Sequence, residues 1–559
     1  MNRTKLKIKP AYIILALAVL TYILQIVIFL TNENNYAYDA KYVTEMAVDH
    51  VYGHMQDWQK IYLMNNPNNL GIVYVASLFV RLGRMLGLNG LTIMRLFGMM
   101  LTVVAAVIVG IFLDRTGASP VVSVMGFLLT AFLVCLHPGA TVPYTDVYSV
   151  FFPILIAWMF NRIRSHKIFG FGEFLGIMVV VAIGILIKPT NIFMAVAICM
   201  LELAGWICKR ISWEEMSKCM LAVLLAMVVY LCFKSAILDQ FDYHYSERYE
   251  KTWTHYAMLG LNVESNGKYN VADDDYTNSY VTKEAKEAAN IAMIKKRLKD
   301  LGPKGYLKLV ASKTKESYGD GFYGAVFWCG HSDIIWKPAR TAVWIAVMLL
   351  SLLALFMGNP YYRGAGEVML ELCCLLYFVY LTVFEAGGRY LYHYAPVYIL
   401  LGMIGVQKLI NWITKRDCRV VAAYKIPGVD GHKDYTLELI QLIFMILWLI
   451  FIGESAHFSW GYPAFFVLAV LCGFGDWRVN GRGYRREIKP IARMIIETVS
   501  LIGTCGVCFT NWNIFIGINL LDEILKGIVV LWGGFFINKN IMYYVFGFVR
   551  GIIITKKSQ

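Results

Sequence analysis

The sequence is poor in charged residues. Only 16% of its 559 residues are Asp, Glu, Lys or Arg, and 58% are hydrophobic, whereas soluble proteins carry roughly 25% charge. Runs such as "AYIILALAVLTYILQIVIFL" and "TAVWIAVMLLSLLALFMG" reach or approach the ~20 apolar residues that cross a bilayer. These features exclude an ordinary soluble globular protein and predict an all-α polytopic membrane protein.

The sequence also lacks the common signatures of soluble catalysis. It contains no Walker loop, HExxH, GxSxG or nucleotide-binding fingerprint. Its twelve cysteines are scattered, and Cys505 and Cys508 have redox-motif spacing, but inside a membrane helix two small buried residues are the favoured interpretation. Cys329 and His331 have no further ligand residues nearby, so no zinc site is assigned.

Positive charge exceeds negative charge by 14. In a membrane protein such an excess marks cytoplasmic loops rather than nucleic-acid binding, and no nucleic-acid partner is expected. Arg3, Lys5, Lys7 and Lys9 precede the first apolar run, which places the amino terminus in the cytoplasm. That run begins at about Ala11, is ~20 residues long and lacks a small-residue cleavage site, so it is predicted to be a retained anchor.

The stretch "LGIVYVASLFVRLGRMLGL" decides the topology. It is short, and Arg81 and Arg84 interrupt it. If it crossed the membrane, the basic segments at 161–167, 209–218 and 408–419 would lie outside. If it lies along the surface as an interfacial helix, all three lie inside, as the positive-inside rule favours. We therefore predict an interfacial helix.

This topology places several polar segments on one outer face. They include "HPGATVPYTD", "ILIKPTN", "FEAGGRYLYHYAP" and a loop of about a hundred residues at 238–340. Within that loop, 283–302 has apolar residues at helical spacing and is predicted to be an amphipathic helix. The preceding stretch 255–280 is rich in Asn, Gly, Asp and Tyr and is predicted to be irregular, typical of a lid or binding loop.

Three regions are predicted along the chain. Residues 1–410 form a catalytic core with the large exterior loop, 411–434 form a cytoplasmic linker, and 435–559 form an accessory transmembrane module of three to five helices. The core is predicted to contain roughly 9–11 membrane-spanning helices. The sequence shows no inverted pair of interrupted helices of the kind that transporters use.

Two aspartates are the candidate catalytic residues. Asp39 follows the first helix, and Asp146 lies in a proline-bounded turn on the same predicted face. One can deprotonate an attacking group while the other positions it or holds a cation; the alternative is that each is an ordinary surface aspartate. Asn65, Asn68 and Asn69 surround a proline that starts a helix, and they either cap that helix or bind a hydroxyl-rich ligand.

Two cations are candidate phosphate ligands. Lys188 ends an apolar run, where it either extends toward the interface or binds a lipid phosphate. Arg389 follows two glycines that permit close approach of a ligand, and guanidinium matches phosphate in bidentate fashion. Glu385 is a candidate substrate contact, or it forms a structural salt bridge with Arg389.

The motifs "PNNLG", "HPGATVPYTD", "KPT" and "GRYLYHYAP" occur in this order after the first helix. The chain over residues 1–410 resembles the membrane glycosyltransferase-C superfamily, in the protein O-mannosyltransferase-like branch. The resemblance implies that Asp39 is the essential acid of the first exterior loop and Asp146 the acid of the second. It also implies that Lys188 and Arg389 hold a polyprenyl-phosphate sugar. Further substrate contacts are expected at His137 and Tyr390 within these motifs, and at His255 in "HYAMLGLN", which also resembles the exterior loop of the family.

The resemblance therefore implies an inverting glycosyltransferase of the plasma membrane. The donor is a polyprenyl-phosphate sugar, and the acceptor hydroxyl belongs to a glycolipid, a wall polymer or a protein. No cofactor is assigned, although a divalent cation, Mg²⁺ or Mn²⁺, is a candidate. Two alternatives remain open, a transporter or flippase of lipid-linked sugars and a non-catalytic envelope scaffold.

Overall fold

A computed structural model describes residues 9–31, 36–166, 170–207, 211–243, 245–319, 336–356 and 365–414. The chain divides into two units. The first comprises Met1–Arg297 and Glu316–Pro427, and the second comprises Leu298–Lys315 and Gly428–Gln559. Most of the second unit lies outside the described residues, as do the predicted carboxy-terminal module, almost all of the predicted linker, Cys329, His331, Cys505 and Cys508.

The described residues are helical, and the predicted all-α polytopic class is confirmed. Nine helical segments among them are long and apolar enough to cross a membrane. The helices are α1 (Pro10–Thr31), α2 (Tyr38–Tyr52), α3 (Asp57–Asn65), η1 (Pro67–Asn69), α4 (Leu70–Leu86), α5 (Gly90–Arg115), α6 (Pro120–Thr130), η2 (Ala131–Cys135), η3 (Pro138–Thr141), α7 (Thr145–Ser149), α8 (Phe152–His166), α9 (Phe171–Ile187), η4 (Pro189–Asn191), α10 (Ile192–Ile207), α11 (Trp213–Gln240), α12 (Trp253–Gly260), α13 (Val271–Asn278), α14 (Lys283–Tyr318), α16 (Lys337–Phe356), α17 (Ala365–Val383), η7 (Gly388–Tyr394) and α18 (Ala395–Ile413).

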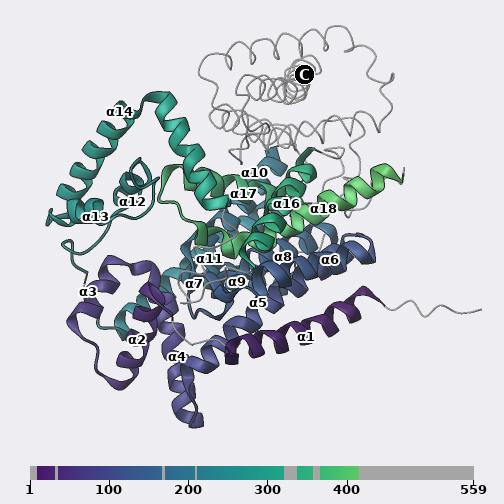
Figure 1. The fold of residues 1–559 in the computed structure, drawn as a ribbon, viewed down its shortest axis with the longest axis horizontal. Coiled ribbons are helices and arrows are strands. Elements are labelled where there is room, and N and C mark those ends of the chain that lie inside the picture. The colour runs from purple at the N-terminus through teal and green to yellow at the C-terminus, as the bar shows by residue number, and fades with distance from the viewer. Residues whose placement is uncertain are drawn as a thin grey trace, which may run out of the picture. The chain divides into compact units, whose positions relative to one another are not determined.

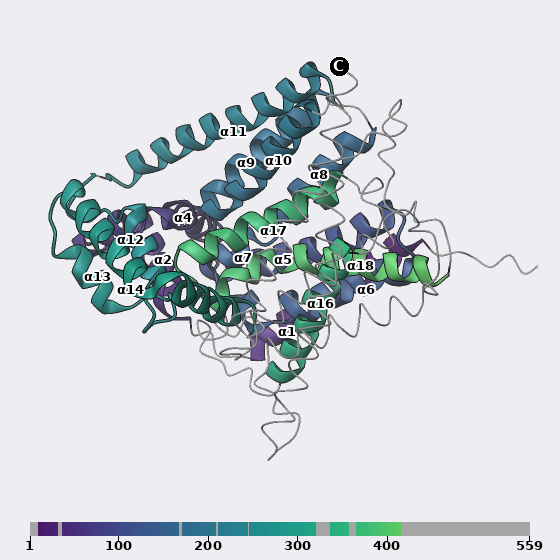
Figure 2. The same cartoon turned by 90° about the horizontal axis from the view of Figure 1, so that it is seen from above.

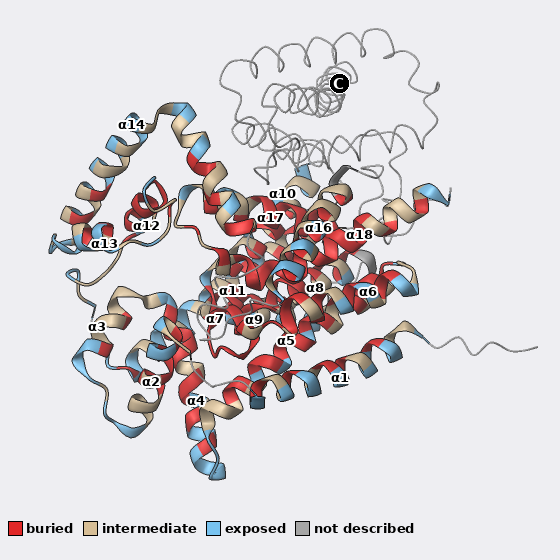
Figure 3. Cartoon of the chain, in the orientation of Figure 1, coloured by how far each residue is buried: buried red, intermediate tan, exposed pale blue. Residues whose placement is uncertain are grey.

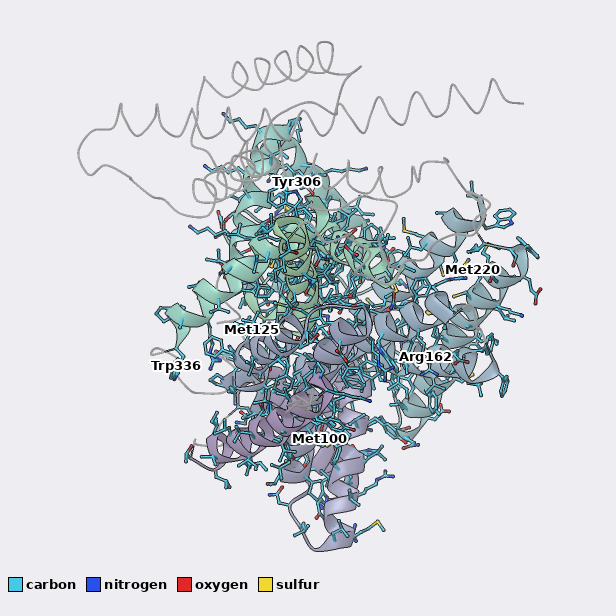
Figure 4. All side chains as sticks on the ribbon, turned by 90° about the vertical axis from the view of Figure 1, so that its right-hand side faces the viewer. Met100, Met125, Arg162, Met220, Tyr306 and Trp336 are labelled. Carbon is cyan, nitrogen blue, oxygen red and sulfur yellow. The ribbon has the colours of Figure 1, made fainter. Side chains whose placement is uncertain are left out.

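Helices α1, α4, α6, α8 and α18 of the first unit pack against α5, and burial is concentrated in the middle of the helices (Figure 3). One apolar cluster joins α1, α5 and α6 through Ile14, Ala106 and Phe127. Many large apolar side chains nevertheless face outward, including Met100 and Met125, which Figure 4 labels. An exposed apolar surface of this extent is unstable in water and favourable in lipid, which fits a membrane-spanning bundle.

Several polar side chains inside the bundle bond to other side chains or to backbone carbonyls. Gln25 donates from Nε2 to Thr102 Oγ1 at 2.9 Å and to the Cys135 carbonyl at 2.7 Å. Arg164 forms a buried ion pair with Glu202, which joins α8 to α10. Such pairing lowers the cost of placing polar groups at membrane depth.

Helix α4 differs in direction from its neighbours. In Figure 1 it runs across the line of α1, and in Figure 2 it is seen nearly end-on, whereas α9, α10 and α11 run lengthwise. Its length and composition still place Pro67–Leu86 among the nine candidate spans. The crossing direction supports an interfacial helix. The interfacial position itself stays a prediction, because the direction of a helix relative to its neighbours does not fix its depth in a membrane.

The stretch 255–280 is more regular than predicted. It contains most of α12 and the whole of α13, so the expectation of an irregular segment was wrong there. The Asn270 side chain accepts a hydrogen bond from the Asp273 backbone N–H, and the acidic residues that follow lie in the first turn, where the helix dipole favours them. The run "ADDD" is therefore the start of a helix. The helix predicted at 283–302 is confirmed as the first part of α14.

Two glycines hold the polar segments against the bundle. A Cβ at Gly71, at the start of α4, would lie 2.1 Å from the carbonyl oxygen of Leu186 in α9. A Cβ at Gly260, at the end of α12, would lie 2.3 Å from the Val383 carbonyl oxygen at the end of α17. Both contacts are with backbone, which cannot rotate away. Only glycine therefore permits these two approaches.

Substituting Gly71→Ala is expected to destabilise the protein by about 1–3 kcal/mol, because the added methyl group forces α4 away from α9. The melting temperature of the detergent-purified protein measures this. Gly172→Ala is the matched control, since a Cβ there meets nothing within 4 Å, and its melting temperature should not fall. Equal melting temperatures for the two variants would contradict the close approach of α4 to α9.

The direction of α4 predicts that His54 and Leu88, one before and one after this helix, lie on the same side of the membrane. Both are exposed, as is Arg115 at the other end of α5. We expect His54→Cys and Leu88→Cys to react with an impermeant maleimide in intact cells, and Arg115→Cys only after lysis, relative to the parent chain. Labelling of only one of the first two would show that α4 crosses the membrane.

Candidate functional site

Four charged side chains from four separate segments meet at one end of the helices. Arg389 Nη1 lies 3.3 Å from Asp146 Oδ2, and Arg389 Nη2 lies 4.0 Å from Asp39 Oδ2. Lys188 forms an ion pair with the other oxygen of Asp146. The structure therefore brings together both predicted acids and both predicted phosphate ligands, with two charges of each sign.

The local sequence explains the positions of Lys188 and Asp146. Lys188 precedes Pro189, which disfavours helical backbone in the preceding residue, and its φ of −147° and ψ of 111° end α9 there. Asn191 then donates from Nδ2 to Ser149 Oγ and to the Gly184 carbonyl, both at 2.8 Å. These bonds tie the end of α9 to α7, which carries Asp146.

Arg389 is held between two aromatic rings. Its guanidinium carbon lies 5.6 Å from the ring centroid of Tyr144 and 5.0 Å from that of Tyr390. Tyr390 in turn donates its hydroxyl hydrogen to Glu385 Oε1 at 2.7 Å. The predicted residues Glu385 and Tyr390 thus lie in the same site. About 20% of the Arg389 side chain remains exposed.

Asp39 belongs to a hydrogen-bonded group that sequence reasoning did not find. Tyr62 donates to Asp39 Oδ1 at 2.7 Å, and the Tyr144 hydroxyl lies 3.4 Å from Asp39 Oδ2. Asn69 contacts both hydroxyls, donating to Tyr62 at 2.8 Å and accepting from Tyr144 at 2.9 Å. The only sequence signal was that both tyrosines lie in the predicted exterior segments. That signal does not distinguish them from the many other tyrosines there.

The residue before Asp39 has an unusual backbone conformation. Tyr38 has a φ of 54°, in the left-handed region that costs a non-glycine residue of order 1 kcal/mol. Such outliers persist where the surrounding structure imposes them, and they gather at functional sites. The turn at Tyr38 begins α2 and directs the Asp39 carboxylate toward Tyr62.

Burial controls the protonation of the groups that surround the two carboxylates. It raises the pKa of Tyr62 and Tyr144 well above the usual range, and the nearby Asp39 carboxylate raises both further. Both hydroxyls are therefore protonated donors at physiological pH. Burial lowers the pKa of Lys188, while its pairing with Asp146 opposes that shift. Burial also raises the pKa of Glu385.

The remaining predicted residues have mainly local contacts. His137 Nδ1 accepts a hydrogen bond from the Gly139 N–H at 3.0 Å and so caps its own turn. His255 Nδ1 lies 2.8 Å from Thr277 Oγ1 and joins α12 to α13; burial lowers its pKa to about 4. Asn68 Nδ2 lies 3.4 Å from Asn69 Oδ1, and Asn65 ends α3.

Asp39 and Asp146 are the residues that would hold a divalent cation. Across the described ranges, His, Cys, Asp and Glu do not gather in any group of three that could hold a metal ion. Magnesium is commonly held by one or two carboxylates together with substrate oxygens and waters. Both oxygens of Asp146 already pair with Lys188 and Arg389, so a divalent cation would have to compete with these side chains, and its binding stays a prediction.

Comparisons with known proteins identify the family of the chain. No protein among the curated ones matches it. One similar solved structure is the archaeal oligosaccharyltransferase AglB from Archaeoglobus fulgidus, in complex with an inhibitory peptide and a dolichol-phosphate. The match has 12% identity and a TM-score of 0.37, and it covers 81% of this chain and 59% of that one. A TM-score of this size does not establish a shared fold.

A family model described as "conserved hypothetical integral membrane protein" matches residues 3–342. That match spans more than half of the chain and includes Asp39, Asp146 and Lys188. It agrees with the apolar helices described above. The chain belongs to this family of integral membrane proteins.

Proposed function

We propose that the protein is a membrane glycosyltransferase. It transfers a sugar from a polyprenyl-phosphate donor to an acceptor hydroxyl at the outer face of the plasma membrane, with its amino terminus in the cytoplasm. The acceptor is a glycolipid, a wall polymer or a protein. The observation that carries the proposal is the convergence of Asp39, Asp146, Lys188 and Arg389 at one end of an apolar bundle.

The two cations suit the donor phosphate. Arg389 offers a planar fork of N–H donors to phosphate oxygens, and Lys188 adds a second positive charge beside it. Both lie where apolar helices end. A ligand with a phosphate head and an isoprenoid tail can therefore place its phosphate at these cations and its tail in the lipid beside the helices. When the bond between sugar and phosphate breaks, negative charge grows on the phosphate, and fixed cations stabilise it.

The two carboxylates have different surroundings and different proposed roles. Asp39 retains about 32% exposure of its side chain and can reach an acceptor hydroxyl, from which it removes the proton. Asp146 is buried and contacts both cations, so it holds them in place or binds a cation. The acceptor oxygen bonds to the anomeric carbon, and the electron pair of the broken bond goes to phosphate. A single displacement of this kind inverts the configuration.

The exterior helices lie next to the site. Gly260 of α12 packs against the end of α17, and the Ala386 N–H donates to the Gly267 carbonyl at 3.0 Å. Ala386 follows Glu385, so these contacts bring α12 and α13 beside the site. We propose that they exclude water, which would otherwise accept the sugar.

Transfer of labelled sugar from a polyprenyl-phosphate carrier by the purified protein tests this function. Asp39→Asn should lower the rate about 10²–10⁴-fold, because it removes the general base. Asp57→Asn is the matched control, an exposed aspartate of the same exterior segment, and it should keep full activity. Full activity of Asp39→Asn would refute the proposed base.

The same preparation separates the alternatives. Movement of the carrier across vesicle membranes without formation of a glycosidic bond would show a transporter or flippase. Absence of both activities, with an envelope defect in cells that lack the protein, would show a scaffold.

Replacing Arg389→Lys should raise the donor KM about tenfold or more, because lysine keeps the charge and loses the planar fork held between Tyr144 and Tyr390. The acceptor KM should change little. Arg248→Lys, at an exposed position of the exterior segment, is the control and should leave both constants unchanged. A rise in acceptor KM alone would place Arg389 at the acceptor instead.

A further inference from the structure

The hydrogen bonds around Asn69 have a defined direction. Asn69 is about 1% exposed, and both ends of its amide are used within the protein. Its Nδ2 donates to the Tyr62 hydroxyl oxygen and its Oδ1 accepts from Tyr144. It precedes α4 without capping it, because its side chain forms no hydrogen bond with the first turn. Helix capping therefore does not explain this residue.

The amide determines where each tyrosine hydrogen points. Because an amide N–H₂ only donates, the hydrogen of Tyr62 is free for Asp39 Oδ1 at 2.7 Å. The single hydrogen of Tyr144 has two acceptors within reach, Asn69 Oδ1 at 2.9 Å and Asp39 Oδ2 at 3.4 Å, and the shorter contact assigns it to Asn69. The opposite amide orientation would place acceptor oxygens at 2.7 and 2.8 Å from the Tyr62 hydroxyl, whose single hydrogen could serve only one of them.

The two oxygens of Asp39 are consequently different. Oδ1 accepts a short hydrogen bond from Tyr62, which occupies one of its lone pairs. Oδ2 has only the longer 3.4 Å contact with the Tyr144 hydroxyl, and it is the oxygen nearer to Arg389, at 4.0 Å. Since Arg389 is the proposed phosphate ligand, Oδ2 is also the oxygen on the donor side.

We propose that Asn69 is a positioning residue that makes Oδ2 of Asp39 the oxygen that receives the acceptor proton. This inference rests on the proposed function. The acceptor O–H bond breaks, its hydrogen binds Oδ2, the acceptor oxygen bonds to the anomeric carbon, and phosphate leaves with the electron pair. Asn69 itself touches neither substrate.

The pH dependence of transfer tests the direction of these bonds. In Asn69→Asp the new side chain can only accept, so it draws the Tyr62 hydrogen away from Asp39. Tyr62→Phe removes that hydrogen outright. Loss of a hydrogen bond to a carboxylate shifts the pH at which it protonates by about one to two units. Both variants should therefore move the acidic limb of the pH–rate profile to higher pH by that amount.

Two further variants make the test specific. Tyr144→Phe should move the acidic limb much less, because its hydrogen goes to Asn69. Tyr148→Phe is the matched control, a buried tyrosine whose hydroxyl donates to the Met94 carbonyl at 2.7 Å, and it should leave the limb in place. An upward shift in Tyr144→Phe with none in Tyr62→Phe would overturn the proposal.

A second measurement does not depend on transfer. A water-soluble carbodiimide reacts with the protonated carboxyl, and peptide mass spectrometry reports its rate at Asp39 as a function of pH. Asn69→Asp and Tyr62→Phe should extend labelling to higher pH, and Tyr148→Phe should not. If this order holds while the wild-type protein transfers no sugar, the proposed function fails and the positioning role stands. An unchanged labelling profile in both variants overturns the positioning role.

Discussion

The pairing of Asp146 with Lys188 and Arg389 is the interaction on which the site depends. The three residues come from the regions that follow α6, α9 and α17, and each would be costly near lipid without a partner of opposite charge. Together they hold three separated segments at one end of the bundle. Asp39 adds a second negative charge from α2, so an anionic ligand meets cations whose charge is already balanced.

Charged side chains are also paired elsewhere in the bundle, but there they form isolated pairs. Arg164 and Glu202 form a buried ion pair between α8 and α10, and Lys408 pairs with Glu367 between α18 and α17. These pairs consist of two partners on neighbouring helices. Five acidic or basic side chains, three tyrosines and a buried amide meet at the candidate site, and part of Arg389 and Asp39 remains exposed. This combination is the reason why we propose a site for chemistry here and structural pairing in the other two cases.

Membership in a family of integral membrane proteins agrees with the helices and does not name a reaction. The proposed glycosyl transfer rests on the chemistry of the site: a carboxylate with an exposed edge, a planar cation between aromatic rings and a second cation beside it. The hydrogen bonds of Tyr62 and Asn69 extend that argument to a single oxygen of Asp39. Each step therefore depends on the geometry of particular residues.

The sequence by itself determined the helical membrane class, the start of the first helix and the helix that begins after Pro67. It did so because apolar length, charge flanks and proline act locally. It also indicated Asp39, Asp146, Lys188 and Arg389, since charged residues between apolar runs stand out from their surroundings.

Only the tertiary structure decided how these residues meet. Tyr62 and Tyr144 could not be distinguished from other tyrosines, because contact with Asp39 depends on segments up to 105 residues apart. The structure also showed that Asn69 is hydrogen-bonded to both tyrosines, while His137 and His255 make mainly local contacts. Gly71 leaves room for a carbonyl of α9, so α4 packs closely on that helix. This long-range contact fixes the position of Asn69, which neither the residue pattern nor the spacing in the sequence could predict.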